Sequence, residues 1–304
     1  MKLAFLYAGQ GAQKPGMGQD LYDEYPEVRG IFDLRPMGLA IRSLCFDSDM
    51  ETISRTEHTQ PCMGAFAAAV TRLLVQNGVA AQCAMGLSLG EYGALHAAGV
   101  LDAGALLDLL AFRGAAMAEA SEGLDCGMTA VLNLASEDVE RAVAEIGGDV
   151  WCCNYNCPGQ TVIGGDRADV EKAAARCLEL GAKRCLTLNV SGPFHTPFMA
   201  PAAEALRGRF QSLALSNMRI PVVFNATGTL LPENETVKNM LVRQVISPVR
   251  VEDGIRALLS LGVDTIIEIG PGNALSGFVK KTAPEITTHN ISTANDFRTV
   301  LEQL

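Results

Sequence analysis

A turn bounded by two glycines, with a serine at its centre, follows an apolar run and precedes a helical pattern. The sequence is GLSLG over residues 86–90, after the apolar run 80–85 and before a helix-like segment from Glu91. A strand that turns sharply into a helix at such a motif exposes the serine hydroxyl, and glycine lets the backbone pack closely around it. The pattern favours an α/β fold with Ser88 as a nucleophile for acyl transfer. A glycine-rich turn with an incidental serine is the alternative interpretation.

Short apolar runs alternate with helical patterns towards both ends of the chain. We expect strands over 2–8, 80–86 and 264–269, and helices over 60–76, 89–98, 104–121 and 274–281. Pro61 is expected in the first turn of its helix, where proline is well tolerated. This alternation is typical of a mainly parallel sheet with helices on both faces.

The middle of the chain has a different pattern. It predicts strands over 127–134, 150–155, 160–164 and 183–190, and helices over 136–146 and 168–180, with Ser136 as a capping residue. The order β-α-β-β-α-β is that of the split ferredoxin-like unit. The predicted fold class is therefore α/β, a large hydrolase-like domain with a parallel sheet (1–123 and 191–304) and a small inserted ferredoxin-like subdomain (124–190).

Composition and charge narrow the possible functions. The chain has 24 Lys and Arg against 34 Asp and Glu, a formal net charge of −10, which disfavours a nucleic-acid binder. No apolar run approaches the length of a membrane span, and the first residues form too short a run for a secretory signal. The nine scattered cysteines indicate reduced thiols without metal-ligand spacing. We expect a cytoplasmic protein without a metal or a membrane partner.

His195 is the candidate base for Ser88. The chain has four histidines, and His195 stands in a Gly- and Pro-bearing loop after the last strand of the insert. Such loops carry catalytic side chains, and imidazole titrates near neutral pH. A loop histidine with only a local hydrogen bond is the other interpretation. His96, on the helix after Ser88, is expected to pack within that helix.

The loop after the first strand is a candidate source of backbone hydrogen-bond donors. Residues 8–13 have the sequence AGQGAQ, which could be taken for a dinucleotide-binding fingerprint. The third glycine of that fingerprint would fall at Lys14, so the dinucleotide interpretation is weak. A backbone N–H from this loop, paired with the N–H of Leu89, would instead form an oxyanion hole.

Eight short motifs follow one another along the chain. They are GQGAQ at 9–13, TQP at 59–61, GLSLGEY at 86–92, RG at 113–114, NYNCPGQ at 154–160, FH at 194–195, LVRQ at 241–244 and EIGPG at 268–272. In this order they resemble the malonyl-CoA:acyl-carrier-protein transacylase family, the acyltransferases of fatty-acid and polyketide synthesis. Each motif is weak by itself, but the series covers nearly the whole chain.

The resemblance implies transfer of a malonyl group from malonyl-CoA to the phosphopantetheine thiol of an acyl carrier protein, by a ping-pong mechanism. Ser88 would carry the acyl group, and His195 would act as general base and acid. The backbone N–H groups of Gln10 and Leu89 would form the oxyanion hole, and the main-chain carbonyl of Gln244 would orient the histidine. No cofactor is implied because the CoA thioester is a substrate, and the family's habit indicates a monomer.

The resemblance also names substrate-binding residues. Arg113 would hold the free malonyl carboxylate with its guanidinium fork; without the family match it reads as a helix-surface arginine. Phe194 would crowd an α-methyl group, or it simply packs its loop. Gln60 and Asn156 are further pocket candidates. Leu87 stands where most of the family has histidine, so any contact of that histidine with the acyl group is absent here.

Two alternative functions remain open at this point: a serine acyl hydrolase or thioesterase, and an acyltransferase with relaxed acyl specificity. A hydrolase of simple acyl groups needs no cationic clamp, so Arg113 is the residue that discriminates the malonyl transacylase from such a hydrolase. A non-catalytic carrier-protein binder would not need Ser88 and His195. An acidic carrier protein would dock on a basic patch, for which sequence clustering offers Lys183, Arg184, Lys280 and Lys281; a merely solvated face is the other interpretation of these four.

Overall fold

The computed structural model describes all 304 residues and divides the chain into two compact units. The first unit comprises Met1–Ala115, Ala214–Val223 and Ala257–Leu304, and the second comprises Ala116–Leu213 and Phe224–Arg256. The predicted insert, 124–190, lies within the second unit, which also takes in chain on both sides of it. None of the helices combines the length and the apolar character needed to cross a membrane.

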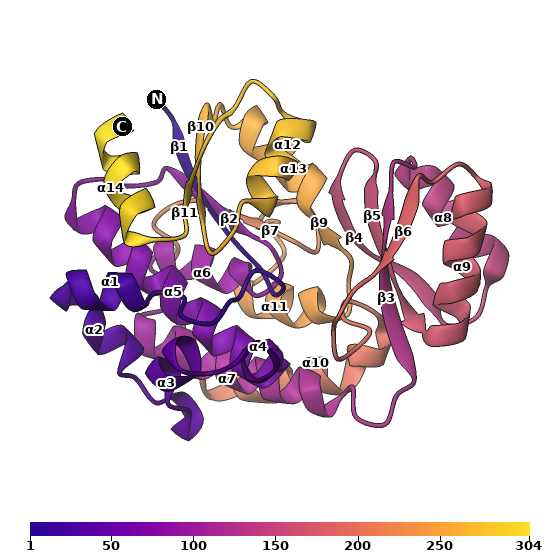
Figure 1. Ribbon diagram of the computed structural model, residues 1–304, viewed down its shortest axis with the longest axis horizontal. Helices are drawn as coiled ribbons and strands as arrows, with labels where there is room; N and C mark the ends of the chain where they lie inside the picture. The colour runs from indigo at the N-terminus through magenta and orange to yellow at the C-terminus, as the bar shows by residue number, and fades with distance from the viewer. The chain divides into compact units, whose positions relative to one another are not determined.

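A parallel sheet forms the centre of the first unit (Figure 1). Its strands run in the order β11 (Thr287–Ile291), β10 (Thr265–Ile269), β1 (Leu3–Tyr7), β2 (Cys83–Gly86) and β7 (Val222–Phe224), and every neighbouring pair is parallel. β1, β2 and β10 are buried along their whole length, as expected of parallel strands covered on both faces. The predicted parallel sheet is confirmed.

Three sequence motifs meet at one edge of this sheet. β1 lies between β10 and β2, so the strand order reverses at β1, and ligands of open α/β sheets bind at the carboxyl ends of the strands near such a point. The loop after β1 begins at Ala8, the turn after β2 contains Ser88, and the loop after β10 begins at Gly270. The topology therefore predicts a site at this edge.

The helices of the first unit are α1 (Gln19–Glu24), α2 (Pro26–Phe32), α3 (Ile41–Phe46), α4 (Met50–Ser54), α5 (Thr56–Gln76), α6 (Gly90–Ala97), α13 (Ala274–Thr282) and α14 (Ala294–Gln303), with a 3₁₀ turn at Pro36–Gly38. Two more, α7 (Ala103–Glu119) and α12 (Val251–Ser260), contain residues of both units. α6 packs against β1 and β2 and also contacts α5. These contacts fix the helix that follows Ser88 against the centre of the sheet.

The start of α5 differs from the prediction. The helix begins at Thr56, four residues before the predicted start, so Pro61 lies inside it and not in its first turn. The backbone N–H groups of His58 and Thr59 donate to the Arg55 carbonyl at 2.9 and 2.8 Å, which closes the first turn. Burial of the apolar residues after Pro61 offsets the one hydrogen bond that proline cannot donate.

The second unit contains the predicted ferredoxin-like arrangement. Its elements are β3 (Cys126–Leu132), α8 (Ser136–Ile146), β4 (Val150–Cys157), β5 (Gln160–Asp166), α9 (Arg167–Glu179) and β6 (Arg184–Thr187). The sheet order is β6-β3-β5-β4, with antiparallel neighbours, and β9 (Val249–Arg250) adds to β4 in parallel. α8 and α9 lie on the same face of this sheet (Figure 1) and cover one apolar core.

The prediction that Ser136 caps α8 is wrong. The N-cap residue is Ala135, with φ −62° and ψ 145°, and no side-chain hydrogen bond caps the helix. Because Ser136 is itself the first helical residue, its hydroxyl is one position too late to accept from the second or third helical N–H. The corresponding position of α9 is capped by Asp166, whose side chain accepts from Ala168 N and Asp169 N.

The rest of the second unit extends the insert. It contains a 3₁₀ turn at Pro197–Met199, α10 (Ala200–Ser212), β8 (Thr229–Leu230) and α11 (Val237–Val245). α10 and α11 pack against each other. The nine cysteines of the whole chain are free thiols.

Candidate active site

Ser88 lies in a strained turn between β2 and α6. Its φ is 52°, in the left-handed region that few residues other than glycine adopt. Both flanking glycines are required, because a Cβ on Gly86 would lie 2.0 Å from the carbonyl carbon of Gly90, and a Cβ on Gly90 would lie 2.3 Å from the carbonyl oxygen of Tyr7. The surrounding structure thus imposes this conformation on Ser88, as in a strand-to-helix turn that presents a nucleophile.

The loop after β1 packs directly on this turn. A Cβ on Gly9 would lie 2.4 Å from Leu87 Cδ2 and 2.7 Å from the Leu87 carbonyl oxygen, so only glycine permits this approach. The next residue, Gln10, donates from its side-chain amide to Thr56 Oγ1 at 3.0 Å. Leu89 is the N-cap residue of α6, and the first N–H groups of a helix have no intrahelical acceptor. Gln10 and Leu89 therefore lie on adjoining segments, beside Ser88.

Arg113 is buried beside Ser88. Only 1% of its surface is exposed, which excludes the helix-surface interpretation. Nη1 donates to Gln60 Oε1 at 2.8 Å, and Nη2 donates to Ser88 Oγ at 3.2 Å. The structure thus brings Ser88, Gln60 and Arg113 into one hydrogen-bonded set within the first unit.

Two further residues set the electrostatics of Arg113. The guanidinium carbon lies 5.4 Å from the ring centre of Tyr92. Burial lowers the pKa of Arg113, while Tyr92 and Glu91 oppose this shift; burial also raises the pKa of Tyr92 to about 12. An arginine keeps its charge under these conditions, so the Ser88 hydroxyl lies beside a buried cation. Sequence reasoning missed Glu91 and Tyr92 as neighbours of Arg113, although both follow the serine turn directly.

His195 in the second unit is held by a main-chain carbonyl. Its Nδ1 lies 2.9 Å from the carbonyl oxygen of Gln244 on α11, and the ring is buried. Because a carbonyl can only accept, Nδ1 carries the proton and Nε2 is the basic nitrogen. The backbone of His195 is also left-handed, with φ 63°. A histidine fixed in this tautomer can take a proton at Nε2.

Phe194 and Asn156 also belong to the second unit. Phe194 precedes His195, is 6% exposed, and its Cε1 would lie 3.0 Å from a Cβ on Gly192. Asn156 on β4 is buried, and its Oδ1 has no hydrogen-bond partner in the protein. Buried polar atoms are rarely left without a partner, so this oxygen is a place where a ligand group can donate.

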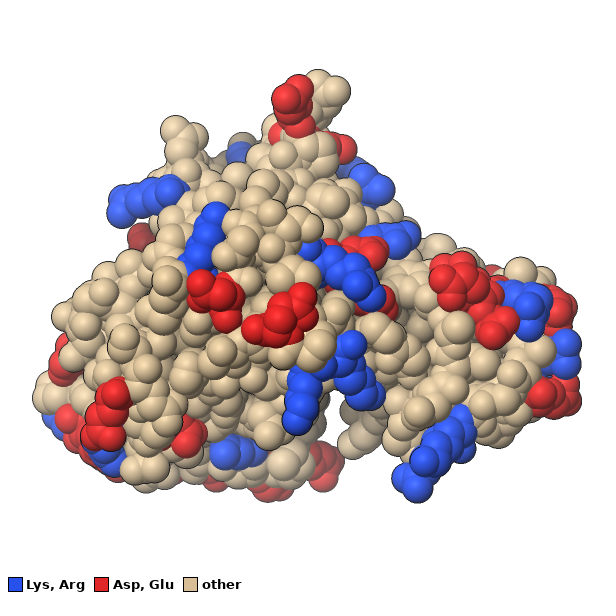
Figure 2. All heavy atoms as spheres, turned by 90° about the horizontal axis from the view of Figure 1, so that it is seen from above, with Lys and Arg blue, Asp and Glu red and all other residues tan.

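The candidate docking residues are all exposed. Lys183 directly precedes β6, Arg184 is the first residue of that strand, and Lys280 and Lys281 lie in the last turn of α13. On the face shown in Figure 2, basic and acidic side chains are interspersed. A docking role for either pair stays a prediction.

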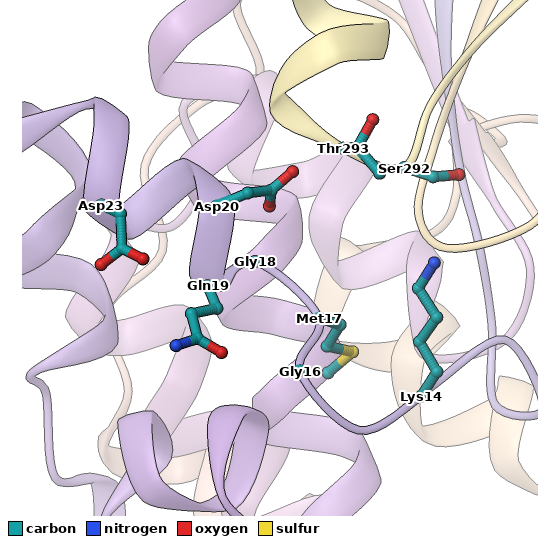
Figure 3. Close-up of a pocket in the computed structure, with 9 residues that line it drawn as sticks. All are labelled: Lys14, Gly16, Met17, Gly18, Gln19, Asp20, Asp23, Ser292 and Thr293. Atoms are coloured by element: carbon teal, nitrogen blue, oxygen red, sulfur yellow. The ribbon is translucent and has the colours of Figure 1, made fainter.

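A polar hollow of about 360 Å³ lies elsewhere in the first unit, between the start of α1 and the loop before α14 (Figure 3). It contains none of the residues predicted for catalysis. In Figure 3 the Asp20 carboxylate points towards the segment with Thr293, and its Oδ2 accepts from Ala294 N at 2.6 Å. A protein carboxylate therefore already occupies the start of α14.

Comparisons with known proteins give matches over nearly the whole chain. The sequence model of the Acyl transferase domain family matches residues 4–297. The chain is 37% identical to the malonyl CoA-acyl carrier protein transacylase of Bacillus subtilis (strain 168), over 100% of this chain and 97% of that protein.

Solved structures give the same result. The malonyl CoA-acyl carrier protein transacylase of Clostridium perfringens matches with a TM-score of 0.95 at 37% identity, over 100% of this chain and 97% of that one. A malonyl-transacylase in complex with a type II PKS acyl-carrier protein matches with a TM-score of 0.96 at 33% identity, over 100% of both chains.

Proposed function

Because this chain belongs to the Acyl transferase domain family, we propose that it moves a malonyl group from malonyl-CoA to the phosphopantetheine thiol of an acyl carrier protein. The observation that carries the proposal is the buried guanidinium of Arg113, which lies 3.2 Å from Ser88 Oγ. It supplies a fixed positive charge next to the acyl-accepting hydroxyl, where a second carboxylate on the acyl group would bind. The names of the similar transacylases support the same substrate and partner.

In the proposed first half-reaction, Ser88 Oγ attacks the thioester carbonyl of malonyl-CoA and its proton passes to Nε2 of His195. The tetrahedral oxyanion accepts hydrogen bonds from the backbone N–H groups of Gln10 and Leu89, and such a donor is worth about 3 kcal/mol of transition-state stabilisation. The carbon–sulfur bond then breaks, and the leaving CoA sulfur takes the proton from His195. A malonyl ester on Ser88 and free CoA result.

In the second half-reaction, His195 takes the proton of the phosphopantetheine thiol. The thiolate attacks the Ser88 ester, the carbon–oxygen bond breaks, and the proton returns to Ser88 Oγ. The Gln244 carbonyl, 2.9 Å from Nδ1, stabilises the imidazolium in both steps without a side-chain carboxylate.

We assign acyl selectivity to three residues. Arg113 binds the malonyl carboxylate through its two terminal nitrogens, and Gln60 holds the guanidinium in place at 2.8 Å. Phe194 crowds the carbon between the two carbonyl groups, so an α-methyl group is disfavoured by about 1–3 kcal/mol.

Steady-state kinetics with varied malonyl-CoA and carrier protein test this proposal. A ping-pong enzyme gives parallel double-reciprocal lines, and malonyl-carrier protein accumulates in proportion to the CoA released. Intersecting lines would contradict the Ser88 intermediate. Release of free malonate in place of malonyl-carrier protein would indicate an acyl hydrolase.

A further inference from the structure

A buried threonine closes the turn that carries His195. The hydroxyl of Thr196 donates to the carbonyl oxygen of Pro193 at 2.5 Å, and Thr196 has no exposed surface. No step of the proposed reaction uses this side chain. We propose that Thr196 is a positioning residue, which holds the backbone of His195 so that the imidazole ring meets the Gln244 carbonyl. The inference rests on the proposed function for the proton transfers that His195 carries out.

The backbone of His195 needs such support. Its φ of 63° lies in the left-handed region, which is unfavourable for a residue with a Cβ. His195 is the third residue of the turn 193–196, and glycine or asparagine usually takes that position when φ is positive. The hydrogen bond from Thr196 to Pro193 spans the histidine. It therefore stabilises a backbone conformation that this residue would not keep by itself.

Two prolines restrict the backbone on either side of the histidine. Pro193 is the first residue of the turn, and Pro197 follows Thr196. A residue before proline avoids the helical region, and Thr196 is extended, with φ −121° and ψ 169°. Its side chain is β-branched and therefore restricted at χ1. Because backbone and side chain are both restricted, little conformational freedom is lost when the Thr196 hydroxyl bonds to the Pro193 carbonyl.

Thr196 also joins the turn to the helices that hold the imidazole ring. Its carbonyl accepts from Met199 N at 3.0 Å, in the 3₁₀ turn that leads directly into α10. α10 packs against α11, which supplies the Gln244 carbonyl to Nδ1 of His195 at 2.9 Å. The backbone of His195 and its ring are thus fixed to the same pair of helices.

Loss of the Thr196 hydroxyl is expected to change the tautomer of His195. When the turn relaxes, the ring moves away from the Gln244 carbonyl, and the hydrogen bond that keeps the proton on Nδ1 is lost. Nε2 then carries the proton in part of the molecules and cannot accept one from Ser88. An error of about 1 Å in the position of a catalytic group slows a reaction by as much as about 10²-fold.

The ring nitrogens of His195 report the tautomer directly. Thr196→Val removes the hydroxyl but keeps the β-branch, and Thr196→Ser keeps the hydroxyl. The ¹⁵N chemical shifts of the ring are measured at a pH where it is neutral, with His195→Ala protein giving the assignment among the four histidines. Wild type and Thr196→Ser are expected to carry the proton on Nδ1, and Thr196→Val to show both tautomers. An unchanged tautomer in Thr196→Val would overturn the inference.

Single-turnover loading of Ser88 from malonyl-CoA gives the second readout. Thr196→Val is expected to load about ten- to a hundredfold more slowly than wild type, with the half-saturating malonyl-CoA concentration unchanged, because substrate binding does not involve Thr196. Thr196→Ser is expected to restore the rate. Thr196→Ala also lacks the hydroxyl and fills less space, so it repeats both measurements if Thr196→Val does not fold.

Thr71→Val is the matched control. Thr71 is buried in the first unit, and its hydroxyl donates to the Ala67 carbonyl at 2.7 Å, so this variant loses a similar hydrogen bond in the other unit. It is expected to lower the Tm and to leave both the His195 tautomer and the loading rate unchanged. Equal losses of loading rate in Thr71→Val and Thr196→Val would mean that Thr196 serves stability alone, and would overturn the inference.

The two readouts separate this inference from the proposed function. If the wild-type protein transfers no malonyl group, the proposed function fails, and the tautomer comparison still decides whether Thr196 positions His195. If malonyl transfer is normal and Thr196→Val keeps both the wild-type tautomer and the wild-type rate, the proposed function stands and the inference fails.

Discussion

Replacing Arg113 with alanine is expected to abolish malonyl selectivity while preserving the nucleophile. The guanidinium is 1% exposed and donates to Gln60 Oε1 and Ser88 Oγ. A bound malonyl carboxylate would accept charge-assisted hydrogen bonds from the same fork. An acetyl group has no carboxylate and therefore loses nothing when the fork is removed.

The expected loss of malonyl loading follows from the burial of Arg113 and from the number of hydrogen bonds that it would donate to the malonyl carboxylate. A hydrogen bond to a charged group contributes about 1.5–3 kcal/mol, so two bonds to one carboxylate contribute about 3–6 kcal/mol. At about 1.36 kcal/mol for each factor of ten, malonyl loading of Arg113→Ala is expected to fall by roughly 10²- to 10⁴-fold. Acetyl loading is expected to stay unchanged or to rise.

The assay is single-turnover loading of Ser88 from malonyl-CoA and from acetyl-CoA. Arg113→Lys keeps the charge without the fork and should recover only part of the malonyl rate. Arg113→Met keeps most of the packing volume and, since burying an arginine is expensive, should unfold at no lower a temperature than wild type. An equal loss of malonyl and acetyl loading in all three variants would refute the clamp.

Three further predictions follow from single contacts. Ser88→Gly removes the backbone strain of a left-handed residue and should raise the free energy of unfolding by about 1 kcal/mol relative to Ser88→Ala. Thermal denaturation measures the difference, and equal unfolding midpoints of the two variants would contradict strain at Ser88. Burial lowers the pKa of His96, whose Nδ1 bonds to the Leu101 carbonyl. The unfolded chain therefore binds more protons at this residue, and the free energy of unfolding should fall as pH drops below about 6.5. His96→Gln should flatten this part of the pH profile of the Tm, and an unchanged slope would exclude His96 as its source. Charge reversal of Lys183 and Arg184, compared with reversal of Lys280 and Lys281, should raise KM for the carrier protein but not for malonyl-CoA; unchanged KM values would dismiss that pair.

The fold and much of the candidate site could be predicted because local patterns agree with the global topology. The parallel strands are continuous apolar runs, and the ferredoxin-like order follows directly from the alternation of elements in the middle of the chain. Gly86 and Gly90 also predicted the turn at Ser88, because the structure has no room for a Cβ at either position.

Other features depend on tertiary contacts and carry no local signal. The start of α5 before Pro61 is set by packing of the buried residues that follow. The predicted cap of α8 was wrong because the helix begins at Ser136, one residue earlier than a capping serine at this position requires. The burial of Arg113 could not be read from its helix, because an arginine in that pattern is usually exposed. The effects of Glu91 and Tyr92 on the pKa of Arg113 could not be predicted from the local sequence either.

The central claim is a malonyl ester on Ser88 that His195 helps to form and to discharge. Intact-protein mass spectrometry after brief exposure to malonyl-CoA tests it most directly, with Ser88→Ala and His195→Ala proteins in parallel. The account predicts one malonyl adduct on the wild-type protein, none on Ser88→Ala, slow formation on His195→Ala, and complete discharge on addition of carrier protein. An adduct that forms on Ser88→Ala, or that decays to free malonate before carrier protein is added, would contradict it.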